Sequence, residues 1–174
     1  LSKILPALLG ALTEAQGTSR EQEELRNAQA VVLSISDDES DIGVSYVMEE
    51  LMSACKSARV EERRSAVTLL HSFCSETKTD YSQYVSQLIR ALIYLFTDSD
   101  QIVLAEAWNA LSAVIKTMDA NEQMSHVQDV RQAIRFAVMD MKQDELLPGF
   151  CLPKGIQPIL PIFRESILNG APEL

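Results

Sequence analysis

The chain has 174 residues, of which 47% are apolar, and this composition predicts a compact unit with a sizeable core. Its formal charge of −10 at pH 7 disfavours direct contact with nucleic acid, because an acidic surface repels phosphate groups, and favours a basic or neutral protein partner. No apolar run approaches the roughly 18 residues of a membrane-spanning helix, so no membrane association is expected.

The three cysteines, Cys55, Cys74 and Cys151, are an odd number without the spacing of a disulfide framework. This usage favours a reducing compartment, the cytosol or the nucleus, and no signal peptide opens the chain. The first residues already have a helical pattern, and the last ones resemble the start of a helix. We therefore expect the sequence to be a piece of a longer protein.

The segment 1–36 is predicted to form a pair of helices. Gly17 breaks the pattern between them, and the second helix ends near Ile35. Its start is a capping box formed either by Thr18 with Glu21 or by Ser19 with Gln22. The first helix has an apolar stripe with helical spacing, made by Ile4, Leu5, Leu8, Leu9 and Leu12.

Two further helix pairs are predicted at residues 42–76 and 80–118, after an acidic loop at 37–41. The pair at 80–118 is the most regular stretch of the chain. Asp80 is its expected N-cap, with Gln83 completing a capping box. A polar turn at 97–100 joins its two amphipathic helices, and so short a turn requires antiparallel packing.

A small residue recurs at the same place in the second helix of each pair. Ala28, Ala66 and Ala107 are separated by steps of 38 and 41 residues. HEAT and armadillo repeats have a period of roughly 40–47 residues. The sequence therefore predicts an all-α fold, a HEAT/armadillo-like α-solenoid of stacked antiparallel helix pairs, in which these alanines lie where neighbouring helices approach closely.

The regularity ends after residue 118. A capping box of Asp119 and Glu122 starts a long, irregular helix that is expected to reach about Met141, and a loop rich in proline and glycine completes the segment 119–155. The segment 156–174 is expected to be the first helix of a truncated repeat.

One loop and two shorter stretches resemble a known family. The loop reads Gly149-Phe150-Cys151-Leu152-Pro153-Lys154, and the stretches are Asp80-Tyr81 and residues 103–111, Val-Leu-Ala-Glu-Ala-Trp-Asn-Ala-Leu. They resemble the very large HEAT-repeat activators of the amino-acid-starvation kinase, the general control non-derepressible one family. The resemblance covers essentially the whole chain.

The resemblance implies a cytoplasmic, protein-binding scaffold segment of a translational stress regulator. Members of the family bind ribosomes and the RWD domain of the starvation kinase, general control non-derepressible two, which phosphorylates the alpha subunit of initiation factor two. The implied partners are therefore this RWD domain and, through the full-length protein, ribosomes. The alternative is a HEAT-repeat transport receptor or phosphatase scaffold, which would lack the Gly149–Lys154 loop.

Three residues are candidates for protein binding. Arg63 and Arg64 lie near the start of a second helix, and Arg64 would either meet an acidic partner or pair with a neighbouring glutamate. Tyr94 shares a polar stripe with Gln83, Gln87 and Arg90, so it is either exposed or in contact with the next repeat. Trp108 is expected to pack in the core rather than to anchor an interface.

No metal, cofactor or catalytic site is predicted. Cys55, His71 and Cys74 could meet between two helices, but a structural zinc site needs four ligands, so buried thiols and a surface histidine are expected instead. Neither His71 nor His126 has an evident nucleophile partner, and no glycine-rich phosphate loop is present. We expect the chain not to be an enzyme.

Overall fold

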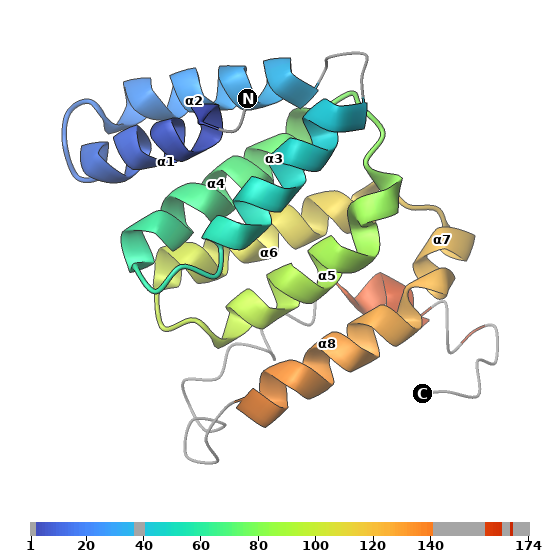
Figure 1. Cartoon of the computed structure of the whole chain (residues 1–174). Coiled ribbons are helices and arrows are strands. Elements are labelled where there is room, and N and C mark those ends of the chain that lie inside the picture. The colour runs from blue at the N-terminus through green and yellow to red at the C-terminus, as the bar shows by residue number, and fades with distance from the viewer. Residues whose placement is uncertain (1–2, 37–40, 141–158, 165–167, 169–174) are drawn as a thin grey trace. The chain divides into compact units, whose positions relative to one another are not determined.

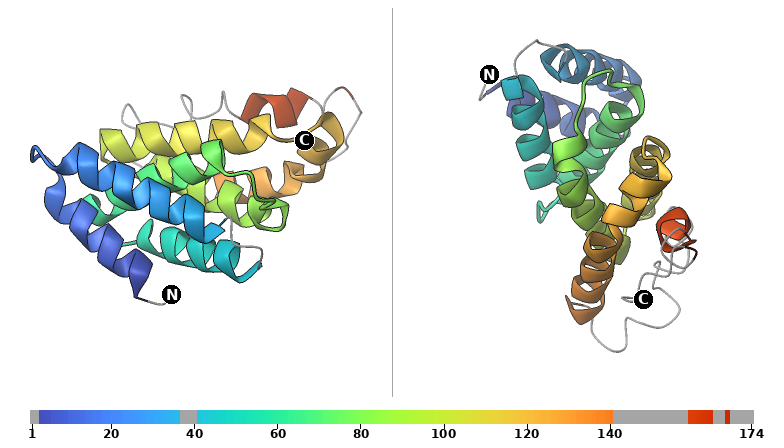
Figure 2. Two further views of the ribbon diagram at one scale, coloured as in Figure 1. Left: turned by 90° about the horizontal axis from the view of Figure 1, so that it is seen from above. Right: turned by 90° about the vertical axis from the view of Figure 1, so that its right-hand side faces the viewer.

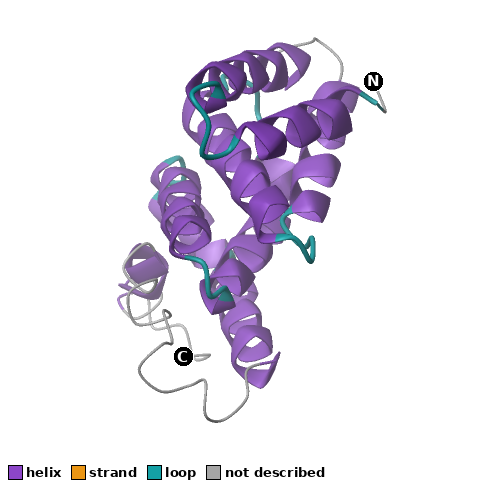
Figure 3. Cartoon of the chain, turned by 90° about the vertical axis from the view of Figure 1, so that its left-hand side faces the viewer, coloured by secondary structure: helices purple, strands orange, loops and turns teal. Residues whose placement is uncertain are grey.

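A computed structural model describes residues 3–36, 41–140, 159–164 and 168 of the chain. All regular secondary structure in this part is helical (Figure 3). The predicted acidic loop, the Gly149–Lys154 loop and most of the predicted C-terminal helix lie outside the described residues. The chain divides into two compact units, residues 1–84 and 85–174.

The described residues of the first unit form four α-helices, coloured blue to green in Figure 1. They are α1 (Ile4–Ala15), α2 (Glu21–Ser36), α3 (Asp41–Ala54) and α4 (Val60–Glu76), and a 3-10 turn, η1 (Ser82–Tyr84), follows them. Helix α1 pairs with α2, and α3 pairs with α4. Helix α4 also packs against α1 and α2, so it holds the two pairs together (Figure 2).

The core of this unit consists of apolar side chains contributed by all four helices. Ala28 and Ala66 are buried, as the repeat predicted. Ile4 differs from the prediction, since it is 42% exposed. The buried stripe of α1 is therefore narrower than the sequence pattern suggests, and it consists of Leu5, Leu9 and Leu12.

The turns of the first unit follow from local chemistry. Gly17 adopts a φ of 73°, a conformation that glycine tolerates best, and it ends α1. Thr18 and Glu21 both accept backbone N–H groups here, but they do not form the predicted capping box, because the Thr18 N–H donates to the Ala15 carbonyl instead of the Glu21 carboxylate. The Thr18 hydroxyl accepts from the backbone N–H of Arg20, and the Glu21 carboxylate accepts from that of Gly17.

Gly43 lies where α2 and α3 approach each other closely. A side chain at this position would collide with the backbone carbonyl oxygen of Ile35, at the end of α2. Gly10, in the middle of α1, has open space where a side chain would lie. Packing therefore requires a glycine at position 43, whereas position 10 has room for a larger side chain.

The second unit contains α5 (Val85–Tyr94), a 3-10 turn η2 (Leu95–Thr97), α6 (Gln101–Lys116), α7 (Ala120–Ser125) and α8 (Val127–Asp140). Helix α5 packs against both α6 and α8. Figure 1 shows α5 and α8 side by side and running in the same direction. Ala107 of α6 is fully buried, as the repeat predicted.

The capping box of Asp119 and Glu122 is confirmed, with a carboxylate of each accepting from a backbone N–H of the other. The prediction of one long helix after it is wrong, because the helix breaks at His126 and continues as α8. A short turn takes the place of the predicted capping box of Asp80 and Gln83. Asp80 accepts from the N–H of Ser82 in a short turn, and α5 begins at Val85.

Candidate functional site

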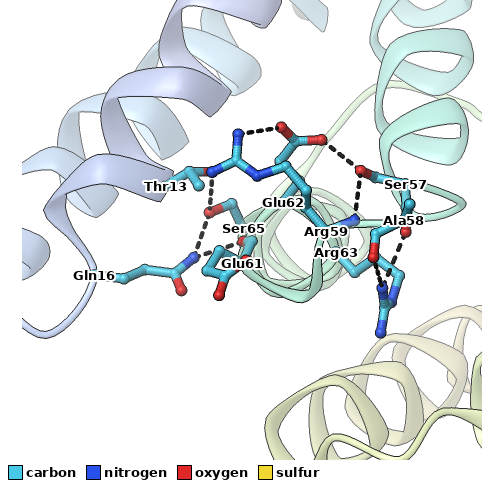
Figure 4. A network of polar contacts seen from close by, with 9 residues as sticks. All are labelled: Thr13, Gln16, Ser57, Ala58, Arg59, Glu61, Glu62, Arg63 and Ser65. Carbon is cyan, nitrogen blue, oxygen red and sulfur yellow. Dashed lines mark hydrogen bonds and ion pairs between the residues drawn. The ribbon is translucent and has the colours of Figure 1, made fainter.

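Helices α1 and α4 are joined by uncharged polar side chains (Figure 4). The hydroxyls of Thr13 and Ser65 lie 3.1 Å apart, and both residues are buried. The Gln16 amide donates to the Ser65 hydroxyl over 2.8 Å and to the backbone carbonyl of Glu61 over 2.6 Å. A similar bond joins α2 to α4, where the Gln29 amide donates to the Ser72 hydroxyl over 2.7 Å.

Arg63, a predicted protein-binding residue, closes the loop between α3 and α4. Its guanidinium donates to the carbonyl oxygens of Ser57 and Ala58, at 3.0 and 3.1 Å (Figure 4). Arg59 in the same loop forms an ion pair with Glu62 at 2.9 Å. The geometry therefore gives Arg63 a local structural role.

The other two predicted residues differ in exposure. Arg64 is half-buried. Tyr94 lies at the end of α5, where its side chain is 43% exposed. A role for Arg63, Arg64 or Tyr94 in protein binding stays a prediction.

A groove of about 310 Å³ lies between α1, α3 and the start of α4. Its charged lining is mainly acidic, since Glu14, Glu50 and Glu62 face it together with Arg59, which pairs with Glu62. Gly10 leaves part of its α1 wall without a side chain. Such a surface suits a positively charged segment better than an anionic one.

A second polar cluster joins α5 to α8, and sequence reasoning missed it. Asp129 accepts from the Ser86 hydroxyl at 2.7 Å and from the Arg90 guanidinium at 2.6 Å, and its carboxylate lies 3.1 Å from His126 Nδ1. Burial alone raises the pKa of Asp129. These hydrogen bonds and the charge of Arg90 outweigh that effect and hold the pKa below its usual value.

This cluster contains a serine, a histidine and an aspartate, but it is not arranged for nucleophilic catalysis. A catalytic triad needs the serine on one imidazole nitrogen and the carboxylate on the other. Here Ser86 and Asp129 both approach Nδ1 of His126, and Ser86 donates its proton to the carboxylate. The arrangement therefore fastens two helices and does not activate a nucleophile.

Cys55 and Cys74 are buried thiols, as predicted. Burial raises the pKa of each thiol to about 12, which makes both thiolates rare at neutral pH. His71 is half-buried rather than on the surface. Within the described ranges, no three His, Cys, Asp or Glu side chains gather as a metal site would require.

Trp108 is half-buried, whereas it was expected to lie in the core. Trp108 lies beside the fully buried side of α6, which is formed by Val103, Ala107, Ala110, Leu111 and Val114. Among the helices that the structure describes, none is long and apolar enough to cross a bilayer.

Comparison with known proteins identifies the family. Residues 1–154 match the family model described as "Stalled ribosome sensor GCN1-like, HEAT repeats". The chain is 44% identical to the "Stalled ribosome sensor GCN1" of Mus musculus and 42% identical to that of Homo sapiens, over 99% of its length in both cases. It is 28% identical to the "eIF-2-alpha kinase activator GCN1" of Saccharomyces cerevisiae over 98% of its length.

The chain spans only 6% of each of these relatives. No solved structure matches it significantly. The relatives do not favour a transport receptor or a phosphatase scaffold, and the match confirms the HEAT-like solenoid predicted from the repeat period. The helix pairs and the sequence match agree, and this chain belongs to the GCN1-like HEAT-repeat family of stalled ribosome sensors.

Proposed function

We propose that this chain is a non-catalytic, protein-binding scaffold segment of a cytoplasmic translational regulator. The observation that carries the proposal is the match to the GCN1-like family over residues 1–154. The printed names of relatives describe a sensor of stalled ribosomes and an activator of the eIF-2-alpha kinase. A solenoid segment in such a protein holds spacing and curvature between the regions that bind the ribosome and the kinase.

The proposed partner of the segment itself is the RWD domain of the starvation kinase, while ribosomes are met by the full-length protein. The acidic groove between α1, α3 and α4 offers a docking surface for a positively charged part of that domain. Helices α1, α3 and α4, which line it, pack against one another, and Arg63 holds the loop before α4, so the groove requires little reorganisation on binding.

The test is a calorimetric titration of the 174-residue chain with the kinase's RWD domain at low and high salt. Saturable binding that weakens with salt supports an electrostatic docking surface on this segment. Glu50→Gln is then expected to weaken binding, while Glu23→Gln, an exposed change on α2, serves as the matched control. Arg64→Ala and Tyr94→Ala test the other predicted residues in the same assay.

If the folded chain fails to bind the RWD domain, the docking part of the proposal is wrong. The segment then acts as a spacer, with docking elsewhere in the longer protein. Circular dichroism and the melting temperature of the same sample show whether the chain was folded during the titration.

A further inference from the structure

The groove between α1, α3 and the start of α4 contains a glycine that packing does not require. Gly10 lies in the middle of α1 and lines the groove. Apart from its own helical turn, no atom is within 4 Å of the place where a side chain would begin. Glycine inside a helix costs stability relative to alanine. The gap at Gly10 leaves room for a group that enters the groove from outside.

The size and the apolar lining of the groove limit what this group can be. Pro6 and Leu9 of α1 and Ala54 of α3 line it together with Gly10. Its volume of about 310 Å³ is near the lower end of the roughly 300–1,000 Å³ that ligand pockets occupy. The groove therefore suits one extended side chain with an apolar stem.

Two carboxylates without partners line the same groove. Glu14 comes from α1 and Glu50 from α3. Within the described part of the chain, neither carboxylate has a hydrogen bond or an ion pair. Glu62 differs, since its carboxylate accepts from the Ser57 hydroxyl and pairs with Arg59 (Figure 4). The charge left for a ligand is therefore negative, and it comes from Glu14 and Glu50.

The gap and one of these charges lie in one row along α1. Pro6, Gly10 and Glu14 are four residues apart, so they follow one another on the same side of the helix. A side chain that passes Pro6 and Gly10 therefore leads toward the Glu14 carboxylate. Glu50 faces the same groove from α3.

We propose that this groove binds one lysine side chain of a partner segment. The methylene stem lies along Pro6, Leu9 and the gap at Gly10, and the ammonium group meets the carboxylates of Glu14 and Glu50. The inference rests on the proposed docking role of the groove. It adds the chemistry of the ligand, and it makes Gly10 the residue that admits the stem.

Lysine fits the two carboxylates better than arginine or a metal ion does. An ammonium group has three donors and can meet acceptors from two different helices, whereas the planar guanidinium matches the two oxygens of one carboxylate. Calcium takes six to eight oxygen ligands. Among the described residues, no three His, Cys, Asp or Glu side chains are grouped to hold a metal ion.

The test titrates a capped peptide of about 12 residues, with one central lysine among alanine and serine, into the isotopically labelled 174-residue chain. At about pH 6.5 we expect amide chemical shifts to change at the groove-lining residues of α1 and α3, with a Kd of about 1 mM. Norleucine in place of lysine removes the charge, and diaminobutyrate keeps the charge but shortens the stem. Each is expected to bind about fivefold more weakly, and the arginine peptide is expected to bind more weakly than the lysine peptide.

Variants of the chain test the same contacts from the other side. Gly10→Leu fills the gap and is expected to weaken binding of the lysine peptide about tenfold without lowering the melting temperature. Ala11→Leu is the matched control, since it adds the same side chain to an exposed position outside the groove lining. Glu14→Gln and Glu50→Gln are each expected to weaken binding about threefold, and Glu23→Gln is their control.

Several results would overturn this inference: no binding at about 10 mM peptide, equal binding of the norleucine or diaminobutyrate peptide, tighter binding of the arginine peptide, or an unchanged affinity in Gly10→Leu. The RWD titration separates this inference from the proposed function. If the RWD domain binds wild type and Gly10→Leu equally, the lysine site is wrong and the scaffold proposal stands. If the lysine peptide binds as expected and the RWD domain does not, the lysine site stands and the kinase partner is wrong.

Discussion

The two units fasten their helices with different chemistry. In the first unit, hydroxyl and amide groups bridge α1 to α4 and α2 to α4, as in the pairs Thr13–Ser65 and Gln29–Ser72. In the second, ionisable groups bridge α5 to α8 through Arg90, His126 and Asp129. Uncharged hydrogen bonds do not respond to pH, whereas a bridge built on a carboxylate is lost in acid, below about pH 4, once the carboxylate takes up a proton.

Similar helix pairs in one chain can therefore differ in their sensitivity to acid and salt. A stack of repeats derives its stability from packing within and between neighbours. The polar bridges add to that packing, and their type determines where acid or salt weakens the stack first. We expect the α5–α8 contact to be the acid-sensitive one of these bridges.

The substitution with the largest expected effect lies in the core of the first unit. Ala66→Glu places a charge at a position with 0% exposure, where the helices leave no room for its hydration. We expect a loss of about 3–5 kcal/mol in the free energy of unfolding. Thermal denaturation measures it, with Ala11→Glu on the exposed side of α1 as the control. An unchanged melting temperature would show that the predicted repeat register is wrong.

Gly43→Ala tests the packing of helices in the first unit and leaves the polar bridges unchanged. The added methyl group collides with the Ile35 carbonyl, and we expect a loss of about 1–3 kcal/mol. Gly10→Ala is the matched change in open space, and it is expected to stabilise the chain by about 0.5–1 kcal/mol. Chemical denaturation of both variants measures the difference. Equal effects of the two substitutions would contradict the close approach of α2 and α3.

Asp129→Asn tests the ionisable bridge of the second unit. We expect a loss of about 1–2 kcal/mol at pH 7, because charged hydrogen bonds from Ser86 and Arg90 are weakened. The folded pKa of Asp129 is lowered, so its contribution is complete above the unfolded value of about 3.9 and is lost as pH falls through the folded pKa.

The stability of wild type and Asp129→Asn should therefore converge below about pH 4. Urea denaturation across pH 2–8 measures this convergence. Amide exchange in α8 serves as the local readout. A constant difference between the two proteins at all pH values would contradict an ionised Asp129 in the bridge.

The smallest expected effect concerns the uncharged bridge of the first unit. Ser65→Ala removes the hydroxyl that contacts Thr13 and Gln16, and we expect a loss of about 1 kcal/mol. This loss should stay the same across the pH 2–8 range used for Asp129→Asn and between low and high salt. A pH-dependent loss would remove the contrast between the two units.

Much of the fold could be predicted because its signals are local. The alanines of the repeat, Ala28, Ala66 and Ala107, are buried, and the Asp119–Glu122 capping box forms as its spacing indicates. The sequence pattern places Trp108 in the core because it indicates one apolar stripe on α6. The buried side of that helix also includes Val103 and its neighbours at helical spacing.

The polar clusters could not be predicted, because their members are distant in sequence. Ser86 and His126 are 40 residues apart, and their contact depends on α8 packing against α5 after the break at His126. The requirement for glycine at position 43 likewise depends on where α2 ends. The roles of Arg63, Arg64 and Tyr94 depend on a partner, which no local pattern identifies.

The buried thiols of Cys55 and Cys74 have a consequence for oxidants. Burial raises the pKa of both thiols, so the thiolate, which is the form that reacts with peroxide, is rare at neutral pH. While the first unit stays closed, neither sulfur is therefore a target for oxidation or alkylation. Modification of either cysteine records an opening of the helix pairs, so the two sulfurs can serve as native reporters of mechanical strain on the solenoid.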